Sequence, residues 1–420
     1  MKKVLLSCVL AIGLLPVAHA QEEEPGRNPT VSYLMEQFGI SEKKAQERID
    51  LQLDIADLSQ AIEDGDFPGY IDMYIQHEPN FKVEVLFNKD EVDGLFNKND
   101  LIMGLDQAQQ KKLRPHVRIR KIKGAREDIV QQMQALSLLF DTTGVRYLGG
   151  FNLQSMKFTF TAETNTDIAL LQAVVPAELF EDVVLEFGAV PSIQLVSGNL
   201  PGDTITGGDT IRTAASSTAL RCTLGYAVTY RIGTTTKQGM LTAGHCDDTM
   251  FYNVNGHWVT LSNPFVQRDQ VGKYDYQIWD LTGLPTSFSI TYRNLNGIPE
   301  FPSTGTLDLT GIMSFNNQKS GMVVCKSGAV TGITCGQITN GNATFNGASG
   351  YIQVSKTLQA DISAGGDSGG PWFLYPGSSR DITGVGVHTA GGGTGTSSVA
   401  IYMPIDYIDD HVISVNTLKK

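Results

Sequence analysis

A serine framed by glycines near the C-terminus is the residue of this sequence best suited to nucleophilic chemistry. It lies in residues 364–372, which read AGGDSGGPW. Glycine permits positive φ and close approach of a substrate carbonyl, so such a turn can expose the hydroxyl of Ser368. In that geometry the amides of Gly366 and Ser368 can point at one spot and stabilise an oxyanion. Because serine is a weak nucleophile at neutral pH, a base must come from elsewhere in the chain.

The candidate base is His245, in the segment 241–246 (LTAGHC). A lone histidine is more often structural, and His257 and His388 compete for the role in the same half of the chain. His245 is favoured because it adjoins Cys246, and a disulfide at that cysteine would fix the backbone beside it.

A serine–histidine pair needs a carboxylate that orients the imidazole and stabilises its protonated form. Residues 271–280 (VGKYDYQIWD) offer two. Asp275 begins an alternating strand and is the favoured residue, while Asp280 at the far end is the alternative. Asp367, beside the serine, should be buried in its turn and would then need a cationic partner.

The element that must position these residues is a β-rich half. Beyond a Gly/Pro/Asp-rich linker at 197–209, short runs of Val, Ile, Thr and Tyr alternate with Gly, Asn and Pro. This texture predicts an all-β barrel or sandwich over 205–420. Helical periodicity returns only at 404–416.

The first half has a different sequence pattern, with helical periodicity as well as strand-like alternation. Residues 21–29 are acidic and predicted to be disordered, and residues 30–64 are predicted to be helical, with Ser41 as a helix cap. Between 70 and 200 the pattern predicts α+β units with helices on antiparallel sheet. The expected strands are 81–87, 117–122, 156–160 and 183–187, and the expected helices are 125–140 and 165–174. No catalytic cluster occurs here, so this half is expected to serve the second.

Composition places the chain in an oxidising compartment. Residues 1–20 read as a signal peptide with Lys2 and Lys3, an apolar stretch and a small-residue end. The protein is therefore expected to be exported and soluble, without a membrane partner. Four cysteines remain after the signal, which implies two disulfides rather than a zinc site. Three pairings are possible, and local spacing favours Cys222 with Cys246 and Cys325 with Cys335.

The net charge of −12 lies almost entirely before residue 205. Neither half is basic enough to suggest nucleic-acid binding.

The order of His245, Asp275 and Ser368, with the sequences TAGHC, DYQI and GDSGGP, resembles the chymotrypsin-like serine proteases. More narrowly, ITGGD at 205–209, RCTLGY at 221–226 and the CKSG segment from Cys325 resemble the bacterial alpha-lytic protease and streptogrisin branch. The resemblance covers about residues 205–416. It implies two six-stranded antiparallel β-barrels with the site between them, and both disulfides as paired above.

The resemblance also implies a mechanism and a maturation pathway. His245 takes the proton of Ser368 as the serine attacks a peptide carbonyl, Asp275 holds the imidazole, and water resolves the acyl-enzyme. No metal or organic cofactor is needed. Residues 21–204 are similar to prosegments that assist folding, inhibit the enzyme and are then removed. Thr204–Ile205 fits the start of the mature family, while Asp203–Thr204 is an alternative acidic bond.

The segment 386–392 (GVHTAGG) looks like the strand that lines the specificity pocket of glutamyl endopeptidases. A histidine there can donate a hydrogen bond to a substrate carboxylate. The expected pocket residues are His388, Thr389, Gly391 and Gly365. A single glutamate, Glu300, occurs in 205–420 against fifteen in 21–204, which favours cleavage after Glu or Asp. The alternatives are a structural histidine with preference for small or apolar residues, and a catalytically silent binding domain.

Two positions depart from the branch. Lys326 stands where an arginine is usual, so it becomes the candidate partner of Asp367, as a point charge instead of a planar fork. Ile362 stands where many relatives place a cysteine of a third disulfide, so the pocket walls are expected to be more mobile. An esterase is disfavoured because the sequence lacks a GxSxG elbow between strand and helix.

Overall fold

The computed structural model describes residues 28–92, 96–192, 196–197, 205–216, 219–254, 257–262, 266–271, 274–281, 286–295, 303–355, 361–376, 380–408 and 412–415. The predicted signal peptide, nearly all of the acidic stretch 21–29, both candidate maturation bonds and Glu300 lie outside these ranges. Within them, no helix is both long and apolar enough to cross a membrane.

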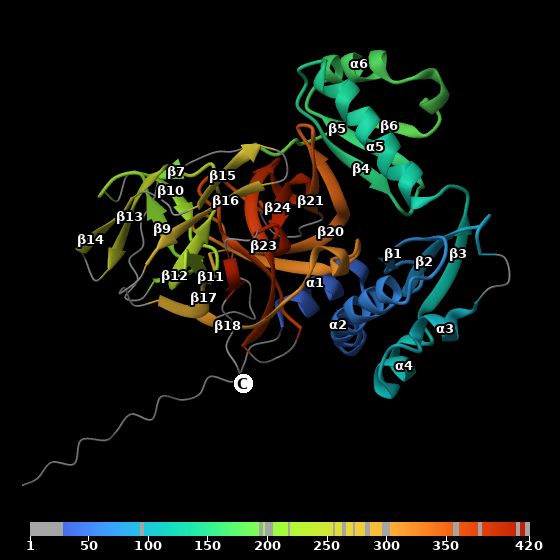
Figure 1. Cartoon of the computed structure of the whole chain (residues 1–420), viewed down its shortest axis with the longest axis horizontal. Helices are drawn as coiled ribbons and strands as arrows, with labels where there is room; N and C mark the ends of the chain where they lie inside the picture. The colour runs from blue at the N-terminus through green and yellow to red at the C-terminus, as the bar shows by residue number, and fades with distance from the viewer. Residues whose placement is uncertain are drawn as a thin grey trace, which may run out of the picture.

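Six antiparallel strands in the C-terminal half close into a barrel. They are β19 (Val323–Gly328), β20 (Gly332–Phe345), β21 (Ala348–Ser355), β22 (Pro371–Leu374), β23 (Asp381–Gly392) and β24 (Val399–Pro404). Figure 1 labels four of them, β20, β21, β23 and β24, in its orange and red part. Hydrogen bonds run β19–β20–β21–β24–β23–β22 and return to β19. Because a closed barrel has no free edge, its inward-facing side chains are fixed in register. The predicted all-β class of the C-terminal half is confirmed.

Among the described residues, ten other strands form two sheets of five, where the resemblance implied a second closed barrel of six. The orders are β15-β16-β12-β11-β25 and β14-β13-β9-β10-β7. Their strands are β7 (Val196–Ser197), β9 (Thr210–Arg212), β10 (Leu220–Thr223), β11 (Ala227–Ile232), β12 (Thr235–Thr242), β13 (Thr249–Val254), β14 (His257–Ser262), β15 (Val266–Val271), β16 (Tyr274–Asp280) and β25 (Val412–Val415). Both sheets contribute to one core, in which Met240 and Trp279 pack with Cys222 and Tyr252.

In the described part of 404–416, the periodicity does not produce an α-helix. The chain makes a 3₁₀ turn at Ile405–Tyr407 and then β25, which pairs with the edge of β11. The β-branched residues Val412, Ile413 and Val415 suit an extended edge strand better than a helix.

Three further strands join the two halves of the β region. They are β8 (Ile205–Gly207), β17 (Thr286–Arg293) and β18 (Thr304–Ile312). β17 pairs antiparallel with β18, whereas β8 with β17 and β18 with β23 pair in parallel. The β region is therefore mixed at its edge and antiparallel in the closed barrel.

The first N-terminal unit packs helices on a three-stranded sheet. Its elements are α1 (Pro29–Phe38), α2 (Glu42–Asp64), β1 (Tyr70–Gln76), β2 (Lys82–Asn88), α3 (Lys98–Ile102), α4 (Gln107–Leu113) and β3 (Val117–Ile122). The predicted helical stretch is two helices, because Gly39 takes φ +59° and ends α1, and Ser41 then stands at the N-cap of α2.

The second N-terminal unit contains α5 (Arg126–Asp141), β4 (Leu148–Asn152), β5 (Lys157–Ala162), α6 (Asn165–Val174), a 3₁₀ turn (Ala177–Leu179) and β6 (Val183–Phe187). The predicted antiparallel sheet holds for only one pair of strands in each unit, β1 with β2 and β4 with β5. β2 with β3 and β5 with β6 are parallel. The helices between each pair supply the crossover that a parallel pair requires.

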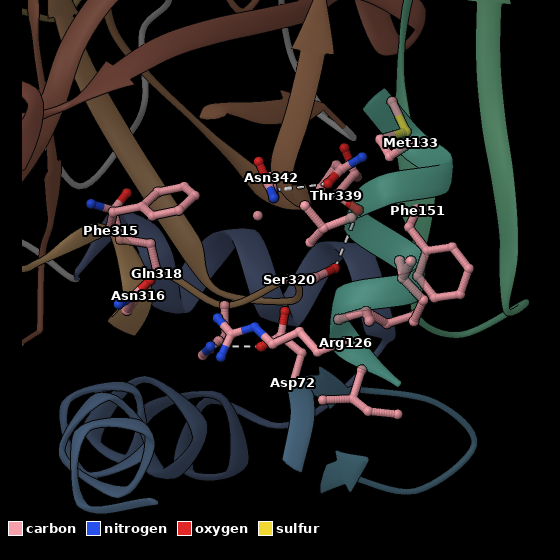
Figure 2. Close-up of a pocket in the computed structure, with 17 residues that line it drawn as sticks. Asp72, Arg126, Met133, Phe151, Phe315, Asn316, Gln318, Ser320, Thr339 and Asn342 are labelled. Atoms are coloured by element: carbon pink, nitrogen blue, oxygen red, sulfur yellow. Dashed lines mark hydrogen bonds and ion pairs between the residues drawn. The ribbon is translucent and has the colours of Figure 1, made fainter. Parts of the chain in front are cut away.

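Both N-terminal units dock on the closed barrel. β4 adds to β20, where Thr344 lies opposite Gly149, so the sheet of the second unit continues that of the barrel. Leu58 of α2 shares a hydrophobic core with Val324 and Val354 of the barrel. A cavity of about 110 Å³ lies where both units meet the barrel. Figure 2 shows Arg126, Ser320 and Asn342 among its lining residues.

Candidate active site

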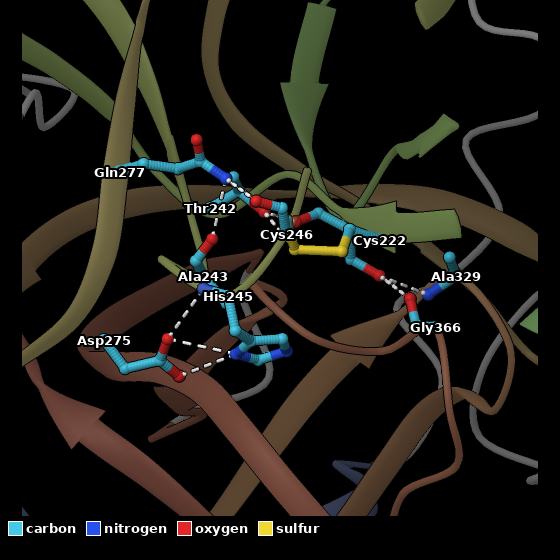
Figure 3. The surroundings of a disulfide bond; sticks show 10 residues. Cys222, Thr242, Ala243, His245, Cys246, Asp275, Gln277, Ala329 and Gly366 are labelled. Atoms are coloured by element: carbon cyan, nitrogen blue, oxygen red, sulfur yellow. Dashed lines mark hydrogen bonds and ion pairs between the residues drawn. A yellow bond between two sulfur atoms is a disulfide. The ribbon is translucent and has the colours of Figure 1, made fainter. Parts of the chain in front are cut away.

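The candidate base and its carboxylate are positioned by two paired strands. β12 pairs antiparallel with β16, so that Thr242 lies opposite Gln277. β12 therefore ends three residues before His245, and Asp275 lies two residues beyond this pairing, close to the histidine. The carboxylate of Asp275 is fully buried and accepts from His245 Nδ1 at 3.0 and 3.1 Å and from the His245 amide at 3.1 Å (Figure 3).

Gln277 secures the loop that carries His245. Because side chains alternate along a strand, Gln277 lies on the same face of β16 as Asp275. Its Nε2 donates to the carbonyls of Ala243 and Cys246, at 3.0 and 2.9 Å. The sequence analysis missed this residue, although the i, i+2 spacing from Asp275 was a signal for it.

The alternatives to these two residues lie elsewhere. Asp280 is partly exposed and pairs with Lys237. His257 is exposed on β14. The third histidine of this half, His388, is buried on β23 and contacts different groups, described below.

The predicted disulfides are both present. Cys222–Cys246 joins β10 to the loop of His245, as Figure 3 shows, and Cys325–Cys335 joins β19 to β20. The first therefore ties the histidine loop to the strand that contacts the serine turn.

The serine turn packs on the first β half. Its Gly369 has φ +89°, and a Cβ there would lie 2.1 Å from Thr242 Oγ1 and 2.8 Å from the Ala243 amide. Thr223 donates its amide to Ser368 O and its hydroxyl to Gly366 O, both at 2.8 Å. Only glycine fits the contact at 369, and this contact brings Ser368 to the loop of His245.

The hydrogen bond between His245 and Ser368 is not formed in this structure. His245 Nε2 is buried and has no partner among the described residues. Since Nδ1 donates to Asp275, the unprotonated nitrogen of a neutral imidazole is this Nε2, the one required for a general base. Such bonds are often long before substrate binds.

Gly366 takes φ +95°, the left-handed conformation that the sequence analysis expected of the turn.

Asp367 is fully buried, and Lys326 is its cationic partner. Lys326 Nζ lies 2.8 Å from Asp367 Oδ2, and both side chains have no exposed surface. The carboxylate also accepts from the Thr331 hydroxyl and from the amides of Val330, Thr331 and Ala364. Burial would raise the pKa of Asp367, but the charge of Lys326 and the side-chain hydrogen bonds from Lys326 and Thr331 lower it to about 2. Lysine thus replaces the arginine of the branch.

The predicted pocket residues come from β23 and from the segment before the serine turn. His388 is 1% exposed, and its Nε2 lies 2.7 Å from Ser363 Oγ. Trp372 Nε1 donates to His388 Nδ1 at 3.2 Å. Gly391 faces Ser363, because a Cβ at 391 would lie 2.3 Å from the Ser363 hydroxyl. Sequence reasoning missed Ser363 and Trp372 as neighbours of His388.

The other pocket positions are less constrained by contacts. Thr389 is buried, and its hydroxyl has no partner in the described part of the chain. Gly365 is partly exposed beside the serine turn. Ile362 is fully buried, and its carbonyl accepts from the Thr334 hydroxyl at 2.8 Å. No described contact tests the predicted mobility of the pocket wall.

Comparison with known proteins identifies the family. No family model matches the chain. The chain is 30% identical over 171 residues to glutamyl endopeptidase 2 of Streptomyces griseus, and the match covers 39% of this chain and 78% of that protein. It is 32% identical over 179 residues to serine protease 2 of Streptomyces fradiae, covering 40% and 87%. The chain belongs to the family of chymotrypsin-like serine proteases. It is accordingly a serine endopeptidase, with protein or peptide substrates.

Solved structures give weaker matches to this protease. A glutamic-acid-specific serine protease, described as using a histidine triad in substrate binding, matches with a TM-score of 0.35 and 23% identity, over 48% of this chain and 95% of that one. Protease A of Thermobifida fusca matches with a TM-score of 0.33 and 26% identity, over 49% and 94%.

Proposed function

We propose that this serine protease is made as an exported zymogen and that its mature domain, residues 205–420, cleaves peptide bonds after acidic residues. Ser368 is the nucleophile, His245 the general base and Asp275 the group that orients His245. The amides of Gly366 and Ser368 form the oxyanion hole. The observation that carries this assignment is the buried Asp275–His245 pair, whose free Nε2 belongs to the loop on which the serine turn packs.

The mechanism follows from this arrangement. The carbonyl of the scissile bond is attacked by Ser368 Oγ while His245 Nε2 takes the hydroxyl proton, and the imidazolium is stabilised by the buried carboxylate of Asp275. The proton then passes to the leaving amine. Water, activated by the same imidazole, hydrolyses the acyl-enzyme. Removing one oxyanion donor in such a site typically lowers kcat about 10²–10³-fold.

The zymogen proposal is supported by how the N-terminal half contacts the site. Ser192 donates its amide to the carbonyl of Gly391 at 2.9 Å, so residues of the first half occupy the edge of β23 that adjoins the pocket. Val196 pairs with Arg221, next to the disulfide at Cys222. A substrate peptide that pairs with Gly391 would compete with Ser192 for this edge of β23. Residues 21–204 are accordingly proposed as an inhibitory prosegment that assists folding.

Acidic specificity is supported by His388 and Ser363, which are hydrogen-bond donors buried beside Gly391, and by the relative that is a glutamyl endopeptidase. Export is supported by the leader sequence and the disulfides.

Three experiments test these proposals. Purified protein should be labelled by a fluorophosphonate probe and lose the label in Ser368→Ala; labelling that persists in the variant contradicts the nucleophile assignment. A peptide-library profile should show glutamate or aspartate on the acyl side of the cut. N-terminal sequencing of the matured protein distinguishes Thr204–Ile205 from Asp203–Thr204. A profile dominated by small or apolar residues would favour the alternative specificity.

A further inference from the structure

His388 is enclosed by hydrogen-bonding groups that leave its ring one protonation pattern. The indole nitrogen of Trp372 can only donate, and it points at His388 Nδ1. Nδ1 must therefore be the unprotonated nitrogen. The proton of a neutral His388 is then on Nε2, which donates to Ser363 Oγ at 2.7 Å.

Trp372 is itself held in place. Its side chain is fully buried and stacks on the ring of Tyr402, with centroids 5.1 Å apart and planes at 25°. The hydroxyl of Tyr402 donates to Gln318 Oε1 at 2.7 Å. The indole therefore cannot turn away from His388 without disturbing this packed group.

The hydrogen bonds from Trp372 to His388 and from His388 to Ser363 form a relay, which ends at Ser363. Its oxygen accepts from His388, which leaves the serine hydrogen as the donor that can face a ligand. Ser363 Oγ lies against Gly391, on the strand edge that also binds the backbone of Ser192. An extended peptide paired with Gly391 would thus bring a side chain near this hydroxyl.

We propose that Trp372 fixes the tautomer of His388, so that Trp372, His388 and Ser363 present a neutral hydrogen-bond donor to the substrate side chain, and that the pocket therefore accepts glutamine as well as glutamate. This rests on the proposed function, in which His388 lines the specificity pocket. A neutral O–H or N–H donor bonds a carboxylate oxygen and an amide oxygen alike. Strong preference for glutamate over glutamine would require a cation in the pocket that is not already paired with another group.

The surrounding charges agree with a neutral ring. Burial lowers the pKa of His388 to about 3; the positive charge of Lys326 acts in the same direction, Asp367 opposes it, and His245 adds a small lowering. Lys326 cannot serve as that unpaired cation, because its ammonium group is paired with the buried carboxylate of Asp367. In this arrangement Trp372 is a positioning residue and Ser363 the one that touches substrate.

The first test compares peptides that differ only in the residue on the acyl side of the scissile bond: glutamate, glutamine, lysine or leucine. We expect kcat/KM for glutamate and glutamine to differ by less than about 10-fold, with both well above lysine and leucine. A ratio of glutamate to glutamine above about 10³ overturns the neutral relay but leaves the proposed acidic specificity standing. Equal cleavage of all four overturns both.

The second test is Trp372→Phe, which removes the indole donor and lets His388 place its proton on Nδ1. Ser363 would then donate to Nε2 and lose its free hydrogen. We expect kcat/KM to fall about 10–100-fold for the glutamate and glutamine peptides, and less than about 3-fold for leucine. Trp279→Phe is the matched control, because Trp279 is equally buried but its Nε1 has no partner among the described residues. Equal losses on all peptides would contradict the relay.

A measurement that leaves Trp372 in place covers the case that Trp372→Phe does not fold. In ¹⁵N-labelled full-length Ser368→Ala protein, the ring nitrogens of His388, assigned by difference from His388→Gln, should report a protonated Nε2 and an unprotonated Nδ1 between pH 5 and 8. A proton on Nδ1, or titration of the ring in that range, overturns the proposal.

Discussion

Replacing Lys326 by methionine should strongly destabilise the protein, because it leaves the Asp367 carboxylate buried without a countercharge. Lys326 Nζ is 2.8 Å from Asp367 Oδ2, and neither side chain is exposed to water. Removing one partner of such a pair costs about 3–5 kcal/mol. For a domain of this size each kcal/mol lowers Tm by about 2–4 °C, so we expect a fall of roughly 6–20 °C.

The assay is a thermal unfolding scan of full-length Ser368→Ala protein with and without Lys326→Met, at one scan rate so that autolysis and kinetics do not differ. The matched control is Lys237→Met, which removes the partner of Asp280 in a pair whose side chains are 29% and 35% exposed. A partly exposed pair contributes at most about 1 kcal/mol. If the two variants lose the same Tm, the buried pair does not stabilise the serine turn as inferred.

The pH dependence of Tm gives a second test, because the direction of its change follows from the pKa of Asp367. In the parent, the folded pKa of Asp367, about 2, lies below its unfolded value. The carboxylate therefore contributes stability above about pH 4, and this contribution is lost as the pH falls toward 2. In Lys326→Met the buried carboxylate of Asp367 has no countercharge, which raises its pKa in the folded state. Protonation of Asp367 should therefore remove part of the destabilisation of the variant. The Tm difference between the two proteins should shrink on acidification. A difference that grows below pH 5 would refute the reasoning.

Three further outcomes follow from the geometry. Asp275→Asn should lower kcat about 10⁴-fold with little change in KM, measured by steady-state kinetics, because the imidazole loses the carboxylate that sets its tautomer; a loss below 10-fold would contradict the role. Gly391→Ala should lower kcat/KM at least 10-fold, because the new Cβ would lie 2.3 Å from Ser363 Oγ; unchanged kinetics would remove Gly391 from the pocket. Replacing Cys325 and Cys335 by alanine should cost about 2–3 kcal/mol in urea unfolding of the Ser368→Ala chain, as expected for a bridge that closes a short loop.

The sequence predicted the elements that local pattern determines. The helix Asn165–Val174 and the strand Val183–Phe187 have the predicted bounds. A capped segment with apolar periodicity indicates the helix, and a run with β-branched residues indicates the strand. The pairing of Cys222 with Cys246 was likewise favoured by short spacing. Parallel pairing of β2 with β3 was not predictable in this way, since it depends on a crossover that leaves no periodic signal.

The neighbours of His388 were missed for a related reason. Ser363, Trp372 and His388 are separated in sequence, and they meet only through the register of the closed barrel, in which Trp372 lies opposite Gly386. Register shifts between Trp372 and Phe373, and between His388 and Ala390, change which side chains point inward. A pattern of alternation cannot locate such shifts, because each one exchanges the two faces of a strand.

β23 connects the three parts of the site that a protease must coordinate. The carbonyl of His388 accepts from the Gly369 amide and its amide donates to Gly370 O, both at 2.8 Å, so the pocket histidine is bonded directly to the serine turn. Three residues further along the same strand, Gly391 accepts from Ser192. A peptide that pairs with Gly391 is therefore aligned on the strand that fixes both Ser368 and His388. Under the proposed zymogen function, the N-terminal half, which uses that edge through Ser192, would block binding of a peptide without displacing the Asp275–His245 pair.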